Sequence, residues 1–136
     1  MGKTILVVEN DSDETVLLSR MLEKKLVDYK SHFVRDGIEA QTFLIAQAKQ
    51  KNCSAKHLPE FILLDSKLPR MDAVQFLKWL RAQPGLLKSI PVIACSSSDF
   101  PDDIHRLTEA GADAFLLKPV GLVELFSKLK EIQKRK

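Results

Sequence analysis

The sequence has little of what marks several large classes of protein. It contains two cysteines and three histidines, Cys53, Cys95, His32, His57 and His105, at spacings that fit neither a disulfide framework nor a zinc site. No apolar run approaches the ~18 residues that a membrane-spanning helix needs. The net charge of +3 is small and dispersed, so nothing indicates a nucleic-acid partner. We therefore expect a protein of the reducing cytoplasm that binds neither membrane nor nucleic acid.

The composition is that of an ordinary globular domain. Hydrophobic residues make up 45% of the chain and charged residues 29%. A chain of 136 residues can bury one full hydrophobic core, and it is short for two. We expect a single domain over residues 1–136, with no output domain that binds DNA or catalyses a reaction.

Four short apolar runs each end at a polar residue. Such runs are typical of strands that are buried on both faces of a parallel sheet. A fifth run, Ser31 to Val34, is more polar and predicts an edge strand. The four apolar runs, each with the polar residues that follow it, are Thr4 to Val8 with Glu9 and Asn10, Phe61 to Leu64 with Asp65, Pro91 to Cys95 with Ser96, and Ala114 to Leu117 with Lys118.

Five segments with apolar residues at helical spacing lie between and after these strands. Two of them begin with the pattern of a capping box, Asp11 with Glu14 and Asp36 with Glu39. Gly111 stands where a left-handed helix end is expected. The five predicted helical segments are Leu17 to Leu22, Ala40 to Leu44, Val74 to Leu80, Ile104 to Ala110 and Leu122 to Ile132.

Strands that alternate with helices predict an α/β fold with a doubly wound, five-stranded parallel sheet and five helices. The flavodoxin-like strand order 2-1-3-4-5 places the weak second strand at an edge. In such folds ligands bind at the carboxyl ends of the strands, near the switch point between the first and third strands. Those two ends carry Glu9, Asn10 and Asp65, and the neighbouring ends carry Ser96 and Lys118.

These residue types suit phosphoryl chemistry. Mg²⁺ takes one or two carboxylates, which Glu9 and Asp65 supply, together with phosphate oxygens and water. An aspartate such as Asp65 can also form an acyl phosphate, while a hydroxyl and an ammonium group stabilise the phosphoryl oxygens. Each residue alone has a simpler explanation, as a turn or a strand end. Their meeting at one edge of one sheet favours a site.

The chain resembles the receiver domain of two-component response regulators over essentially its whole length. The segments that carry this resemblance are Ile5 to Asn10, Phe61 to Asp72, Ile90 to Ser96 and Gly111 to Pro119. The likeness implies a phosphorelay protein that accepts a phosphoryl group from a sensor histidine kinase. The loop before Phe61 and the stretch from Ile90 to Pro119 most resemble single-domain regulators that are paired with phytochrome-type sensor kinases.

The resemblance also implies a role for each site residue. Asp65 resembles the phosphoacceptor, Glu9 the acidic Mg²⁺ ligand, Ser96 the phosphate-responsive hydroxyl and Lys118 the invariant-type lysine of the family. The backbone carbonyl of Lys67 falls where the family completes the metal site. Such a protein assists its own phosphorylation and dephosphorylation but is not an enzyme in the usual sense.

The family likeness extends to a switch. Phe115 falls at the position of the family's switch aromatic, and the Lys118-Pro119 peptide bond would be cis. We expect the signalling surface on the fourth helix, fifth strand and fifth helix, roughly Ile104 to Leu129. This patch would suit homodimerisation or docking of a downstream protein whose identity the sequence does not reveal.

Two residues depart from the family pattern, and two other functions compete. Asn10 stands where most receivers have a second acid, so it should bind metal weakly or indirectly, and Ala73 replaces a common glycine.

A degenerate receiver that acts as a phosphorylation-independent scaffold is therefore an alternative. A small phosphohydrolase is the other, but Lys67 stands where such an enzyme needs a general acid.

Overall fold

Five parallel strands form one sheet in the computed structural model, which describes residues 3–25, 28–50, 54 and 57–134. The strand order is β2-β1-β3-β4-β5, and every neighbouring pair is parallel. The predicted α/β class, flavodoxin-like order and edge position of the polar second strand are confirmed. The strands are β1 (Lys3–Val8), β2 (Tyr29–Val34), β3 (Phe61–Asp65), β4 (Val92–Ser96) and β5 (Ala114–Leu117).

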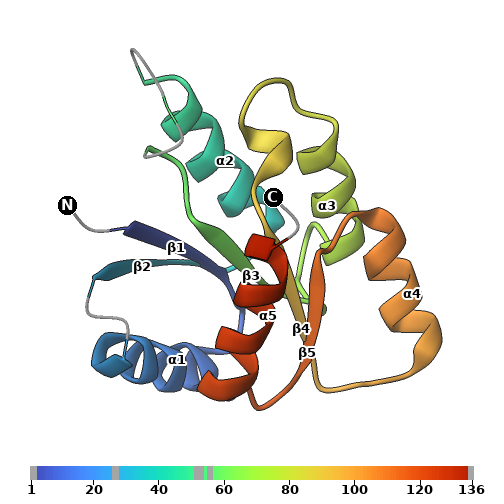
Figure 1. The fold of residues 1–136 in the computed structure, drawn as a ribbon. Coiled ribbons are helices and arrows are strands. Elements are labelled where there is room, and N and C mark those ends of the chain that lie inside the picture. Colours follow the sequence, from blue (N-terminus) through green and yellow to red (C-terminus); the bar gives the residue numbers. More distant parts are fainter. Residues whose placement is uncertain (1–2, 26–27, 51–53, 55–56, 135–136) are drawn as a thin grey trace.

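The helices cover both faces of the sheet (Figure 1), with α1 and α5 on one face and α2, α3 and α4 on the other. They are α1 (Ser12–Lys25), α2 (Gly37–Ala48), α3 (Ala73–Arg81), α4 (Pro101–Ala110) and α5 (Leu122–Lys134). A 3-10 turn, η2 (Leu87–Ser89), was not predicted, because Pro84 and Gly85 interrupt the periodicity before it. As predicted, α4 ends at Gly111, whose φ is 122°. Within the described residues, no helix has the length and apolar character to cross a bilayer.

The core consists of two apolar layers, one on each face of the sheet. Alternate residues of β3 show the division, since Ile62 and Leu64 pack with α2 and α3 while Phe61 and Leu63 pack with α5. All five residues of β3 are buried, including Asp65 at its end. Side chains in such a close-packed core hold few alternative positions. The strand ends therefore present their polar residues from a rigid frame.

Both predicted aspartates cap their helices, but neither capping box is complete, because Oε1 of Glu39 accepts from the amide of the residue before Asp36, at 2.9 Å. Asp36 caps α2, and its side chain accepts a hydrogen bond from the amide of Glu39 at 2.9 Å. Asp11 likewise caps α1 by accepting from the amide of Glu14 at 3.2 Å. The predicted return bond of Glu14 to the start of α1 is wrong, however. Its carboxylate binds Lys118 instead, because α1 packs beside the end of β5 and an ammonium group is the stronger partner.

Candidate functional site

A cleft of about 230 Å³ opens at the carboxyl edge of the sheet, between the ends of β1, β3 and β5. It brings together most of the predicted site residues, which come from segments far apart in the sequence. Ser96 and Phe115 are not among the residues that line it. The lining residues are Glu9, Asn10, Asp11, Glu14, Asp65, Ser66, Lys67, Ser97 and Lys118.

The ammonium group of Lys118 lies at the centre of this cleft. Its Nζ is 2.6 Å from Oε2 of Glu14, 2.9 Å from Oε1 of Glu9 and 3.1 Å from Oδ1 of Asp65. The side chains of Glu9 and Asp65 are only 3% and 9% exposed, whereas that of Glu14 is 38% exposed. One cation therefore faces three carboxylates, two of which are deeply buried.

Burial and mutual repulsion shift the acidity of these groups. The pKa of Glu9 is raised to about 7, first by burial and then by the neighbouring Asp65, against the opposing effect of Lys118. Burial disfavours the charge on Lys118, but hydrogen bonds to Glu14 and Glu9 outweigh it, so the pKa of Lys118 lies above its usual range. The cleft thus holds more negative charge than Lys118 alone can balance.

This donor set fits a hard divalent cation. Glu9 and Asp65 offer carboxylate oxygens, Lys67 lies on the loop that follows Asp65, and the exposed Asn10 lines the same cleft. Among the described residues, no three acidic, histidine or cysteine side chains are grouped closely enough to hold a metal on their own. Mg²⁺ commonly takes one or two carboxylates and completes its octahedron with carbonyl oxygens, phosphate and water. The crowded carboxylates therefore suit Mg²⁺ rather than a metal that needs an all-protein cage.

Ser96 lies next to the cleft rather than in its wall. Its side chain is buried, and its Oγ accepts a hydrogen bond from the amide of Ser98 at 3.1 Å. Its backbone carbonyl accepts from the amide of Lys118 at 2.8 Å, which fixes the end of β4 against β5. The following residue, Ser97, is exposed and lines the cleft. The sequence predicted Ser96 as the site hydroxyl and did not indicate Ser97, because periodicity alone does not fix the last residue of a strand.

Phe115 occupies the middle of β5, opposite Ala94 of β4. It packs against the apolar layer under α3 and α4, whereas Ala114 and Leu116 pack against the other layer. Phe115 therefore lies on the face of the sheet that α4 covers, whereas α5, the other helix of the expected signalling surface, covers the opposite face. The Lys118-Pro119 peptide bond is cis, as predicted.

Glu14 lines the cleft and binds Lys118, but the sequence did not predict this role. A signal for it exists, because Glu14 lies in the first turn of the helix after β1, and that turn lies over the carboxyl edge of the sheet. Its helix-capping pattern suggested a local partner instead. In the structure, its partner Lys118 is 104 residues away.

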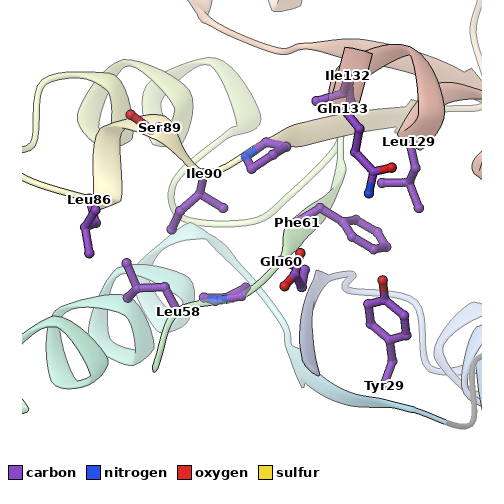
Figure 2. A pocket seen from close by; sticks show the side chains of 12 residues that line it. Tyr29, Leu58, Glu60, Phe61, Leu86, Ser89, Ile90, Leu129, Ile132 and Gln133 are labelled. Atoms are coloured by element: carbon purple, nitrogen blue, oxygen red, sulfur yellow. The ribbon is translucent and has the colours of Figure 1, made fainter. Parts of the chain in front are cut away.

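A second hollow, of about 260 Å³, lies at the opposite edge of the sheet (Figure 2). Apolar side chains dominate it, among them Phe61 and Tyr29, whose rings meet edge to face with their centroids 6.4 Å apart. Glu60 is the one acid among its lining residues. With no converging carboxylates or lysine, this hollow lacks the chemistry of the cleft at the carboxyl edge.

Comparison with known proteins agrees with this geometry. The family model described as the response regulator receiver domain matches residues 5–130. Response regulator Rcp1 from Synechocystis sp. is 31% identical over 131 residues, which cover 96% of this chain and 86% of that protein.

Two solved structures show the same fold. The receiver domain of sensor histidine kinase PA1611 from Pseudomonas aeruginosa PAO1, with a magnesium ion coordinated in its active site cleft, has a TM-score of 0.77 and 27% identity. The alignment covers 98% of this chain and 99% of that one. The phosphorylated cyanobacterial phytochrome response regulator RcpA has a TM-score of 0.74 and 30% identity, with coverage of 98% and 93%.

Proposed function

Because the chain belongs to the response regulator receiver domain family, we propose that it acts in phosphorelay signal transduction by accepting a phosphoryl group on Asp65. The position of Asp65 identifies it as the phosphoacceptor of this proposal. Asp65 ends β3 in the cleft, with Nζ of Lys118 3.1 Å from its Oδ1 and Glu9 bound to the same ammonium group. Receiver domains of this family are in general signalling proteins rather than enzymes.

The donor is the phosphohistidine of a sensor histidine kinase. A carboxylate oxygen of Asp65 attacks the phosphorus atom, the P–N bond breaks, and its electron pair returns to the imidazole nitrogen. The product is an acyl phosphate on Asp65. Lys118 moves from carboxylate oxygens to a phosphoryl oxygen, and the amide of Lys67, now 3.2 Å from Oδ1 of Asp65, keeps the acceptor oriented. The domain thereby assists its own phosphorylation and, with water as the nucleophile, its dephosphorylation.

Mg²⁺ is the cofactor of this proposal. Glu9, Asp65 and the carbonyl of Lys67 would hold the ion, with Asn10 as a weak or indirect ligand. When bound, Mg²⁺ supplies positive charge that neutralises the phosphoryl oxygens and the crowded carboxylates. Magnesium in the PA1611 receiver domain and the Mn²⁺-bound form of Rcp1 support this assignment.

Receiver domains pair with histidine kinases, and the partner of this chain is a sensor kinase of the phytochrome type. The likeness to Rcp1 and to the phytochrome response regulator RcpA supports it. The signal would leave through the surface around α4, β5 and α5, to a partner protein or a second copy of the chain. A cytoplasmic location belongs to the same proposal, since Cys95 is a buried free thiol of the kind that a reducing compartment maintains.

Intact mass spectrometry tests the phosphoacceptor. With acetyl phosphate and saturating Mg²⁺, the wild type should gain the mass of one phosphoryl group and Asp65→Asn should gain none. Asp102→Asn, an exposed change on α4, serves as the matched control and should react like the wild type. If the wild type gains no phosphoryl group, or if Asp65→Asn gains as much as the wild type, the proposal fails and the alternative of a phosphorylation-independent scaffold is favoured. The buried cluster of carboxylates around Lys118 argues against that alternative.

A further inference from the structure

An ion pair joins the loop after Asp65 to the start of α2. Nε of Arg70 donates to Oδ2 of Asp36 at 2.8 Å, and Nη2 of Arg70 lies 2.6 Å from the same oxygen. Asp36 is only 4% exposed, and its other carboxylate oxygen caps α2 through the amide of Glu39. One buried carboxylate thus serves two elements that are far apart in the sequence.

The backbone around this ion pair is under unusual constraint. Among the described residues, Arg70 is the one non-glycine residue with a positive φ, at 63°. This conformation is sterically unfavourable for an L-residue, so the surroundings must hold it in place. Met71 packs so closely on Gly37 that a Cβ added there would lie 2.8 Å from Cγ of Met71. We call Asp36, Gly37, Arg70 and Met71 the α2 clasp.

The α2 clasp holds the second half of the loop between β3 and α3, and the two ends of that loop are fixed by other contacts. At one end, Asp65 closes β3 and accepts a hydrogen bond from the amide of Lys67. At the other end, Asp72 caps α3 in a complete capping box with Gln75. Lys67, whose carbonyl is the proposed Mg²⁺ ligand, lies between Asp65 and the clasp. The direction of that carbonyl therefore depends on where the clasp holds the loop.

We propose that Arg70 and Asp36 are positioning residues for phosphoryl transfer to Asp65, through the loop that presents the carbonyl of Lys67. The inference rests on the proposed function and deepens it. The ion pair keeps residues 66–72 in the strained conformation that Mg²⁺ binding requires. Without it, the loop is no longer tied to the start of α2, the Lys67 carbonyl turns away from the cleft, and the cation loses a ligand. Neither residue touches the phosphoryl group.

Two substitutions separate the ion pair from its neighbours. Asp36→Asn removes the charge but keeps a good helix N-cap, and Arg70→Gly removes the guanidinium group while accepting the positive φ. Each should raise the Mg²⁺ Kd about 10-fold in isothermal titration calorimetry, the usual effect of losing an outer partner of a metal ligand. The double variant should bind Mg²⁺ no more weakly than the single variants, because both remove one interaction.

Kinetics distinguish positioning from general destabilisation. With acetyl phosphate, the Mg²⁺ concentration for half-maximal phosphorylation should rise about 10-fold, with the rate at saturating Mg²⁺ within about twofold of wild type. Arg106→Gly is the matched control, since Arg106 is an exposed residue of α4 whose ion pair with Asp103 measures 3.9 Å. Glycine within a helix lowers its stability, so this control should unfold at a lower urea concentration than the wild type but bind Mg²⁺ normally.

Three outcomes of these experiments would contradict the inference, and they can be told apart. If the Asp36 and Arg70 variants lose stability in urea while their Mg²⁺ affinity stays within about twofold of wild type, the clasp is merely structural and the inference is overturned. If the two single effects on Mg²⁺ affinity add in the double variant, the residues do not act as a pair, and the inference also fails. A wild type that neither binds Mg²⁺ nor accepts a phosphoryl group refutes the proposed function together with the inference.

Discussion

Glu14→Gln should speed the phosphorylation of Asp65, because Glu14 competes with the incoming phosphoryl group for Lys118. The ammonium group of Lys118 has three N–H donors, and carboxylates lie 2.6, 2.9 and 3.1 Å from its nitrogen atom. A phosphoryl oxygen can bind it only after one carboxylate is released. Glu14 is the group to be released, because its side chain is 38% exposed while those of Glu9 and Asp65 are buried.

The size of the effect follows from this exposure. A charge-assisted hydrogen bond contributes about 1.5–3 kcal/mol when it is shielded, and solvent at a 38% exposed carboxylate reduces this to about 1 kcal/mol. Removing the charge of Glu14 should therefore lower the cost of freeing Lys118 by about 1 kcal/mol. That corresponds to a rate increase of about fivefold at saturating Mg²⁺.

The assay is the initial rate of phosphorylation by acetyl phosphate, followed by intact mass. Glu109→Gln is the matched control, since Glu109 is an exposed glutamate on α4 that pairs with His105 rather than with the cleft. The control should leave the rate unchanged. A Glu14→Gln rate equal to or below that of the wild type would refute the reasoning, because it would mean that Glu14 holds Lys118 in its productive position.

Three further predictions concern other parts of the domain. Asn10→Asp should lower the Mg²⁺ Kd about 10-fold in calorimetry, because it adds a carboxylate to the cleft; an unchanged Kd would place Asn10 outside the coordination sphere. Phe115→Ala should leave phosphorylation of Asp65 nearly intact but abolish phosphorylation-dependent hydrogen-exchange changes over residues 104–129; if the wild type shows no such changes there, the switch mechanism is wrong. In a Cys53→Ser background, Cys95 should resist iodoacetamide at pH 8 until the protein unfolds. Burial raises the pKa of its thiol to about 12, so about 1 in 10,000 thiols is ionised, and rapid alkylation of the native protein would contradict this.

The periodicity of the sequence was enough to predict the order and type of the five strands and five helices in the described residues. Strands that are buried on both faces read as unbroken apolar runs, so Phe61 to Leu64 was recognisable without any knowledge of its neighbours. The polar residues at the strand ends followed directly, because parallel strands end at one edge. Cys53 and much of the segment after Lys49, read as a helix end and loop, lie outside the described residues.

Tertiary structure alone decided how the site residues pair. Glu14 was predicted to close a local capping box, yet it binds Lys118, because the docking of α1 brings an ammonium group from the end of β5 within reach. Ser97 rather than Ser96 lines the cleft for a similar reason, since the last pair of β4 with β5 determines which hydroxyl is exposed. The α2 clasp left no sequence signal, because Asp36 and Arg70 are 34 residues apart and each has an ordinary local role. Periodicity reports contacts within one turn or one strand, whereas the packing of whole elements sets the partner of each charge.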